Sequence, residues 1–180
     1  MKRLLVLGAG TAGTMAVNKL RPKLPEDEWN ITVVEQRDTH YYQPGYLFIP
    51  FGTYTPDEVV KPTKKFIPAG VDMISGEVDK VVADENKVLL TDGRELRYDY
   101  LIIASGTTPR PDQTPGMAED EWHKSIYDFY TYEGTCALAE KLKTWEGGRL
   151  VIHITEMPIK CPVAPLEFTF LADAFFEEKG

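Results

Sequence analysis

Short apolar runs alternate with turn residues along the first part of the chain. Residues 3–7 (Arg-Leu-Leu-Val-Leu) are almost wholly apolar, as expected of a parallel strand buried on both faces. Glycines follow at positions 8, 10 and 13, and residues 14–20 have the pattern of a helix. A second apolar run, at 31–34, ends in Glu35. This order predicts a strand, a glycine turn, a helix and a strand, which together form one right-handed βαβ unit.

The middle of the chain changes pattern twice. Residues 37–70 are dense in aromatic residues and prolines, which predicts an ordered excursion and not a linker. From position 71 to 97, short apolar segments are broken by turn residues at 84–86 and 92–93, which predicts an antiparallel meander. Residues 100–104 (Tyr-Leu-Ile-Ile-Ala) predict another buried strand, which ends at Ser105 and Gly106.

The last part of the chain predicts two helices around one strand. Leu138, Leu142 and Trp145 recur at helical spacing within 133–145. Residues 150–154 predict a buried strand, residues 155–165 form a loop with three prolines, and residues 166–178 predict a second helix. One strand and one helix cannot cover both faces of a new parallel layer. Either this strand joins the first sheet, or the chain is the front part of a longer protein, which we favour.

Composition and charge narrow the class of protein. Hydrophobic residues make up 43% of the 180 and charged residues 27%, which suits a folded core. Twenty basic and 28 acidic residues leave a charge of −8 without a basic run, so we expect no nucleic-acid partner. No apolar run reaches the ~20 residues of a membrane span, and the opening lacks a signal-peptide cleavage site. We therefore expect a cytoplasmic protein. Its histidines and cysteines have no metal-binding spacing, so we expect no metal.

The pattern Gly8-x-Gly10-x-x-Gly13 lies directly between the first strand and its helix. Gly8 allows a tight turn, Gly10 lets a pyrophosphate approach the backbone, and Gly13 lets helix and strand pack closely. The helix N-terminus offers free N–H groups to phosphates. Glu35, at the end of the next strand, is placed to accept hydrogen bonds from a ribose diol. The sequence therefore predicts a dinucleotide site.

The surrounding pattern favours FAD as that dinucleotide. The βαβ unit resembles the FAD-binding half of the two-dinucleotide-domain flavoproteins related to glutathione reductase, in which a meander and a late strand ending in a small-Ser/Thr-Gly element complete the flavin site. Residues 99–109 (Asp-Tyr-Leu-Ile-Ile-Ala-Ser-Gly-Thr-Thr-Pro) match that element. The cofactor-binding residues expected on this basis are Gly8, Gly10, Thr11, Ala12, Gly13, Glu35, Gln36, Pro44, Gly45, Val78, Ala104, Ser105 and Gly106.

Two absences separate this chain from better-known members of that group. No cysteine precedes position 136, which excludes the early cysteine pair of glutathione-reductase-type enzymes. The loop at 155–165 contains no glycine, so it offers no second pyrophosphate cradle. A reduced nicotinamide is therefore not the electron donor that we expect.

Cys161 lies in the segment Met157-Pro-Ile-Lys-Cys-Pro-Val-Ala-Pro165, between prolines and before a predicted helix. The helix N-terminus and Lys160 both favour the thiolate, which is the nucleophilic form. Together with Tyr42-Gln-Pro-Gly45, this segment resembles the sulfide:quinone oxidoreductases and the flavocytochrome-c-type sulfide dehydrogenases, over all 180 residues. The resemblance implies that Cys161 takes up sulfide sulfur as a persulfide and passes electrons to the flavin.

Other chemistry-bearing residues have a structural interpretation. Cys136 shares the helix of Leu138 and Leu142, so we expect it to pack in a core. The aromatic cluster at 41, 42, 46 and 48 suits either a flavin shield or the core beneath a proline-rich loop, and both stay open. Some members of the family have a cysteine in a His-x-x-Cys stretch, and the similar segment here, His123-Lys-Ser-Ile-Tyr127, has tyrosine instead. In the family, the partner cysteine, the quinone pocket and the membrane-binding region lie downstream of the position of Gly180.

These observations predict an α/β fold: a Rossmann-like FAD-binding domain with a parallel sheet and an antiparallel meander (1–110), a connector with an amphipathic helix (111–146), and the start of a second dinucleotide-type α/β domain (147–180). We expect an enzyme that oxidises sulfide, or a related small sulfur compound, with a quinone as acceptor. As a full-length protein it would contact the cytoplasmic membrane peripherally, and a homo-oligomer is left open. The alternatives are an NADH:quinone-type dehydrogenase and a non-catalytic FAD-binding fragment.

Overall fold

A computed structural model describes all 180 residues and divides them into two compact units. Unit 1 contains residues 1–41 and 60–107, and unit 2 contains residues 42–59 and 108–180. Each unit is described by itself below. These units do not test the domain boundaries expected from the sequence, which stay a prediction.

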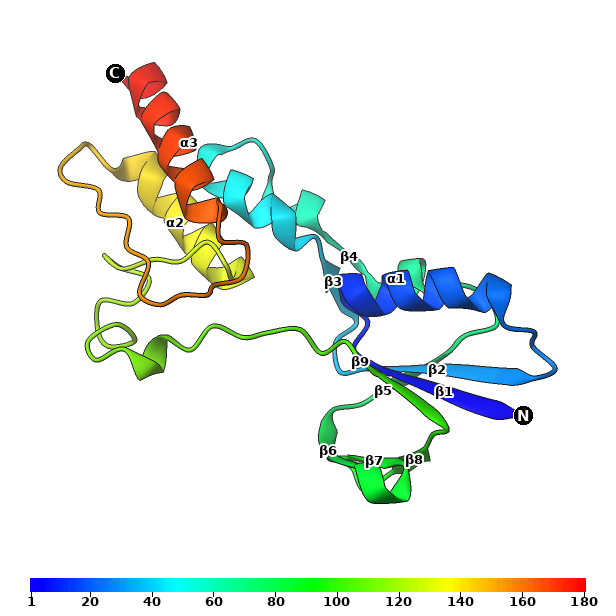
Figure 1. Cartoon of the computed structure of the whole chain (residues 1–180). Helices are drawn as coiled ribbons and strands as arrows, with labels where there is room; N and C mark the ends of the chain where they lie inside the picture. Colours follow the sequence, from blue (N-terminus) through cyan, green and yellow to red (C-terminus); the bar gives the residue numbers. More distant parts are fainter. The chain divides into compact units, whose positions relative to one another are not determined.

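Unit 1 is built on a four-stranded parallel sheet in the order β5-β2-β1-β9 (Figure 1). Its strands are β1 (Lys2–Leu7), β2 (Trp29–Glu35), β5 (Asp72–Ser75) and β9 (Tyr100–Ile103). Helix α1 (Thr11–Leu20) and a 3-10 turn, η1 (Arg21–Lys23), connect β1 to β2. The predicted βαβ unit is therefore present, and helix α1 begins three residues earlier than the apolar pattern indicated.

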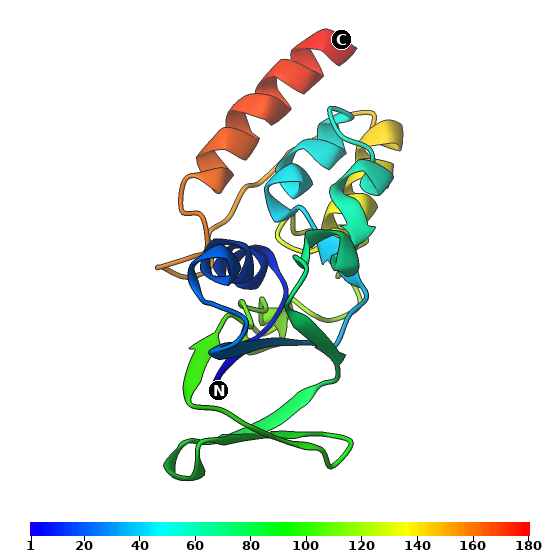
Figure 2. The ribbon, with the colours of Figure 1, turned by 90° about the vertical axis from the view of Figure 1, so that its right-hand side faces the viewer.

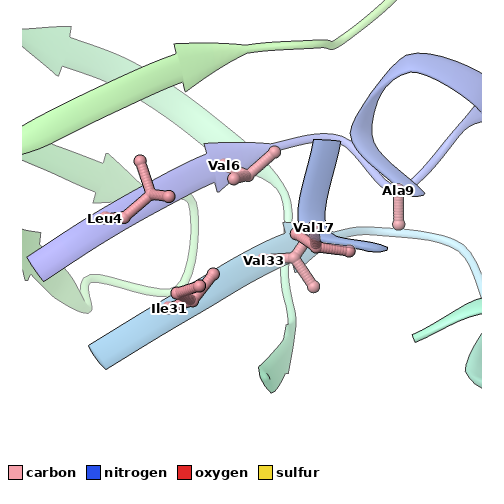
Figure 3. Packing of buried hydrophobic residues seen from close by; sticks show 6 residues of the cluster. All are labelled: Leu4, Val6, Ala9, Val17, Ile31 and Val33. Atoms are coloured by element: carbon pink, nitrogen blue, oxygen red, sulfur yellow. The ribbon is translucent and has the colours of Figure 1, made fainter. Parts of the chain in front are cut away.

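The central strands of this sheet are buried on both faces because their apolar residues alternate between two clusters. Leu4 and Val6 of β1 lie in one cluster with Val17 of α1, and Figure 3 shows them beside Ile31 and Val33. On the opposite face of the same strands, Leu5, Leu7 and Val34 form the second cluster together with Val88, Leu90 and Tyr98 from later in the chain. Burying each such side chain contributes roughly 1.5–3 kcal/mol, so the two clusters fix the register of the strands.

An antiparallel meander covers the second face. It consists of β6 (Val78–Val82), β7 (Lys87–Leu90) and β8 (Glu95–Arg97), with a 3-10 turn, η5 (Ala83–Glu85), between the first two strands. Figures 1 and 2 show α1 and this meander on opposite sides of the parallel strands. A short antiparallel pair, β3 (Thr39–Tyr41) and β4 (Val60–Pro62), and a 3-10 turn, η4 (Thr63–Phe66), complete unit 1.

Unit 2 consists of two helices and several 3-10 segments. Helices α2 (Tyr132–Thr144) and α3 (Ala164–Lys179) share a core with η2 (Gln43–Phe51), and η3 (Pro56–Val59) and η6 (Pro111–Gln113) lie in its connections. Leu138, Leu142, Phe168 and Ala172 form the buried centre. The ring of Phe129 stacks on that of Phe168 with 4.7 Å between centroids, which adds aromatic contact to the burial.

Three expectations about the strands are wrong. Residues 72–75 do not belong to the meander, because β5 pairs in parallel with β2. Strand β9 is not fully buried: it lies at the edge of the sheet, and Tyr100 and Ile103 are 51% and 65% exposed. Residues 150–154 form no strand, and Val151 is 70% exposed, because no other segment pairs with them.

None of the helices is both long enough and apolar enough to cross a membrane.

Candidate functional site

The glycine turn of unit 1 is crowded at two of its three glycines. A Cβ on Gly8, whose φ is 98°, would lie 2.4 Å from the carbonyl oxygen of Ala104. A Cβ on Gly13 would lie 1.8 Å from the carbonyl oxygen of Gly8. Neither neighbour is a side chain that can move aside, so both positions require glycine. The turn, the first turn of α1 and the end of β9 are thereby packed backbone against backbone.

Gly10 differs from the other two glycines because a Cβ there would meet no atom within 4 Å. It is exposed and precedes α1 as the N-cap residue, without a side-chain hydrogen bond to the helix. Thr11 and Ala12, which open the helix, are exposed as well. The amide N–H groups of residues 10–13 donate no hydrogen bond within the protein. Free N–H groups and the positive end of the helix dipole suit an anion such as a pyrophosphate.

Glu35, predicted to contact a ribose, lies half-buried at the end of β2 and binds backbone amides. Its Oε2 accepts a hydrogen bond of 2.7 Å from the N–H of Ala9, and its Oε1 accepts one of 3.1 Å from the N–H of Arg37. A carboxylate offers about four acceptor positions, so two occupied ones leave capacity for a ligand diol. The neighbouring Gln36 is exposed. Glu35 therefore connects the end of β2 to the backbone of the glycine turn.

The end of β9, which carries the Ala104-Ser105-Gly106 pattern, lies against the turn. The N–H of Ala104 donates to the carbonyl of Leu7 over 2.8 Å. Ser105 and Gly106 follow as exposed residues, and the φ of 75° at Gly106 is one that glycine adopts without strain. Val78 is placed differently: it opens β6 and packs against the cluster on the meander face.

The sequence analysis missed His40. Its ring, in β3, has Nδ1 at 3.0 Å from the carbonyl oxygen of Ala9 and packs 4.4 Å from the ring of Phe66. The sequence shows no metal-binding spacing at this histidine, and no local pattern connects position 40 with position 9. The contact follows from the tertiary fold, which brings β3 beside the turn.

In unit 2, Pro44 and Gly45 open the 3-10 segment η2. Pro44 is exposed, whereas Gly45 is buried, and a Cβ on Gly45 would lie 2.5 Å from Cγ1 of Val59. The glycine therefore has a packing reason of its own. The aromatic residues beside it have packing contacts as well, since Phe48 and Tyr42 each contact the ring of Tyr54 edge-on. These contacts support the interpretation of the aromatic cluster as a local core without excluding a flavin shield.

Cys161 is exposed, and its backbone has a φ of 51°, in the left-handed region that disfavours side chains. Two hydrogen bonds hold its carbonyl oxygen there: the N–H of Ala164 donates over 3.0 Å, and the hydroxyl of Tyr130 donates over 3.2 Å. Helix α3 follows the thiol as the sequence predicted, but it begins at Ala164, two residues earlier than the predicted start at 166. Tyr130 is a second residue that the sequence analysis did not identify.

Lys160 connects the two segments that carry the family resemblance. Its Nζ donates a hydrogen bond to Oε1 of Gln43, so the cysteine loop is bound to the Tyr42-Gln-Pro-Gly45 segment. Desolvation lowers the pKa of Lys160, and the negative charge of the neighbouring Cys161 thiolate opposes that shift. The hydrogen bond to Gln43 therefore fixes the position of the Lys160 ammonium group, whose positive charge attracts the Cys161 thiolate.

The second thiol has a different environment. Cys136 is half-buried in α2, so the expectation that it packs in a core holds only in part. Burial raises the pKa of the Cys136 thiol, and the carboxylates of Glu133 and Glu140 raise it further against an opposing hydrogen bond with Tyr132. Its thiolate is disfavoured at neutral pH, and Cys161 is the more accessible of the two thiols.

Comparison with known proteins adds a family. A family model described as "Pyridine nucleotide-disulphide oxidoreductase" matches residues 2–152. A mitochondrial sulfide:quinone oxidoreductase of Dictyostelium discoideum is 27% identical over 99% of this chain, and this chain covers 39% of its length. A type II NADH:quinone oxidoreductase of Staphylococcus saprophyticus is 29% identical over 66% of this chain and 29% of its own length.

A solved structure shows the same fold. The sulfide:quinone oxidoreductase of Aquifex aeolicus aligns with a TM-score of 0.65 at 23% identity, over 79% of this chain and 32% of that one. The chain therefore spans about two fifths of the curated sulfide:quinone relatives that it matches and about a third of this solved structure.

Proposed function

Because this chain belongs to the pyridine nucleotide-disulphide oxidoreductase family, we propose that it is the FAD-binding and sulfur-handling part of an enzyme that oxidises sulfide, or a related small sulfur compound, and reduces a quinone. The observation that carries this proposal is the exposed Cys161 thiol, fixed in front of α3, in a chain that matches sulfide:quinone oxidoreductases over nearly its whole length. The NADH:quinone relatives match about two thirds of it.

The turn of unit 1 fits the pyrophosphate of FAD. Gly8 and Gly13 close the turn, while Gly10, Thr11 and Ala12 present free N–H groups where a Cβ on Gly10 would meet no protein atom. The residues that would hold the rest of FAD are Glu35 and Gln36 at the ribose, and Pro44, Gly45, Val78, Ala104, Ser105 and Gly106 elsewhere. FAD supplies an acceptor for two electrons from sulfur that can also reduce a quinone.

Cys161 would supply the bond to sulfur. In the proposed reaction, hydrosulfide attacks a disulfide between Cys161 and a cysteine beyond position 180, the S–S bond breaks, and the partner thiolate leaves. The sulfide sulfur then remains on Cys161 as a persulfide, and this exchange itself has no net gain or loss of electrons. Lys160, bound to Gln43, provides positive charge next to the sulfur.

A flavin spectrum followed by two anaerobic titrations tests the proposal. The protein should be yellow, and sulfide should bleach the flavin absorbance of the full-length protein. Because the loop at 155–165 contains no glycine, NADH should not bleach it at a useful rate. The second candidate is an NADH:quinone-type dehydrogenase. It is favoured by a relative from Staphylococcus haemolyticus, a type II NADH:quinone oxidoreductase that is 34% identical over 106 residues. Rapid bleaching by NADH would establish this second candidate. A colourless protein would instead indicate a non-catalytic binding module.

A quinone acceptor implies that the full-length protein works at a membrane. Quinones reside in membranes, so peripheral contact with a membrane would come from a region beyond position 180. The cytoplasmic location expected from the sequence stays a prediction.

A further inference from the structure

Ala9 is the one residue of the glycine turn whose two backbone polar groups are both held by side chains. Its N–H donates to Glu35 over 2.7 Å, and its carbonyl oxygen lies 3.0 Å from Nδ1 of His40. Ala9 itself is 1% exposed and belongs to the cluster between β1 and α1. The two side chains come from different strands, β2 and β3, so the turn is fixed from two directions.

The contact with His40 defines the tautomer of the imidazole. A carbonyl oxygen only accepts hydrogen bonds, so Nδ1 of His40 carries the hydrogen and donates it. The ring is kept in this position by Phe66, 4.4 Å away between centroids, and by the pairing of β3 with β4, in which His40 lies opposite Lys61. The donor is therefore held in place by contacts within the protein itself.

This contact decides which way the next peptide group points. A trans peptide is planar, with its C=O and N–H directed to opposite sides. Because His40 binds the carbonyl of Ala9, the N–H of Gly10 is turned away from the histidine. That N–H donates no hydrogen bond within the protein, and the space at Gly10 is open. The same rule applies one peptide earlier, where Glu35 binds the N–H of Ala9 and the carbonyl of Gly8 faces Gly13.

We propose that His40 is a positioning residue for anion binding: by holding the carbonyl of Ala9 it presents the N–H of Gly10 to the pyrophosphate of the dinucleotide. This inference rests on the proposed FAD site, but it concerns a residue that neither the glycine pattern nor the acidic residue after β2 identifies. It also explains why β3 and η4 pack beside the turn although they add nothing to the parallel sheet.

The test uses paired substitutions at His40 and measures FAD affinity by flavin fluorescence. His40→Phe keeps a ring against Phe66 but has no donor, and it should raise the Kd for FAD by about 3- to 10-fold, as expected for one lost hydrogen bond. His40→Asn restores an N–H donor and should stay within about 2-fold of the wild type. His153→Leu, at an exposed histidine of unit 2, is the matched control and should leave the Kd unchanged.

Amide hydrogen exchange provides a readout that needs no FAD. Glu35 still holds the Ala9 amide in His40→Phe, but the turn has lost its other side-chain contact, so it should open more often and this amide should exchange faster than in the wild type. In His40→Asn the wild-type rate should return. Wild-type FAD affinity in His40→Phe, or an equal loss in the Phe and Asn variants, would overturn the inference. A wild-type protein that binds no FAD would overturn the proposed function instead, and the exchange rates of Ala9 would still decide whether His40 positions the turn. If His40→Phe does not fold, His40→Leu takes its place.

Discussion

The glycine turn at residues 8–13 and the cysteine loop at residues 155–165 both contain a residue with left-handed backbone, but the residue types differ. In the turn that residue is Gly8, with a φ of 98°. In the loop it is Cys161, with a φ of 51°, in a segment without any glycine. Left-handed backbone costs a residue with a side chain roughly 1–2 kcal/mol and costs glycine almost nothing.

This difference indicates which property of each segment matters for function. At the turn the absence of a side chain is the functional property, because backbone atoms occupy the space where a Cβ would lie. At the loop the thiol is present although glycine would fit the backbone better, and hydrogen bonds from Tyr130 and Ala164 hold the less favourable conformation. Strained backbone at an exposed nucleophile is typical of reactive sites. The loop therefore supports a chemical role for Cys161 in a way that its sequence spacing alone does not.

The largest expected effect is at Gly13. Gly13→Ala places a Cβ 1.8 Å from the carbonyl oxygen of Gly8, so the helix must move away from the turn, and we expect a loss of about 3 kcal/mol in the free energy of unfolding. Gly10→Ala is the matched control, because its Cβ enters open space: stability should change by less than about 1 kcal/mol while FAD binding weakens. Urea unfolding measures the stability of both variants, and fluorescence titration measures their FAD binding. Equal stability of the two variants would show that the turn is not packed as described.

The next effect concerns Glu35. Glu35→Ala removes the acceptor of the Ala9 amide and the proposed ribose contact, and we expect FAD binding to weaken by roughly 1–3 kcal/mol, as for hydrogen bonds to a charged group. Gln36→Ala, one residue further and exposed, is the control and should have a smaller effect. Fluorescence titration with FAD measures the difference. Unchanged FAD retention in Glu35→Ala would remove this carboxylate from the site.

The backbone strain at Cys161 predicts a smaller effect on stability, in which glycine stabilises the protein relative to alanine. Cys161→Gly should be more stable than Cys161→Ala by about 1 kcal/mol, because only glycine relieves the left-handed backbone. Asn86 has a φ of 48°, but asparagine tolerates this conformation, so Asn86→Gly should increase the stability of the protein by less than this difference. Thermal or urea unfolding of the three variants and of the wild type measures these differences in stability. A glycine variant less stable than the alanine variant at 161 would refute the strain argument.

The smallest effect is a pH dependence at the start of β9. Hydrogen bonds from the guanidinium and backbone N–H of Arg3 lower the pKa of Asp99 from its ordinary value of 3.8 to about 2. A folded-state pKa below the unfolded one means that the carboxylate stabilises the fold above about pH 4, and that this contribution is lost as the pH falls toward 2. NMR titration of Asp99 should give a midpoint near 2, and Arg3→Met should move that midpoint back toward 3.8.

The sequence predicted best what local sterics determine. The strands at 3–7 and 31–34, the helix after Gly10 and the helices around residues 133–145 and 166–178 are present, because buried strands, glycine turns and amphipathic helices each have a short-range pattern. It failed where pairing is long-range. The run at 72–75 looks like a meander strand but pairs with β2, and the apolar run at 150–154 has no partner and forms no strand.

The candidate site was predictable to a similar extent. The glycines and Glu35 were predicted by their spacing, and the structure adds a steric reason for glycine at positions 8 and 13. His40 and Tyr130 were missed, because each acts on a backbone carbonyl 31 residues away, which no sequence pattern encodes. Residues that position a site through its backbone have no characteristic motif, whereas residues that contact the ligand do.

Anaerobic reduction of the flavin by sulfide, in the full-length protein and in its Cys161→Ala variant, tests the central claim most directly. Both proteins should contain the same amount of FAD, since Cys161 lies in unit 2 and the pyrophosphate turn lies in unit 1. Sulfide should bleach the flavin absorbance of the wild type and leave that of the Cys161→Ala variant unchanged. Bleaching of the variant by sulfide at the wild-type rate would contradict the role of Cys161 as the residue that carries the sulfur.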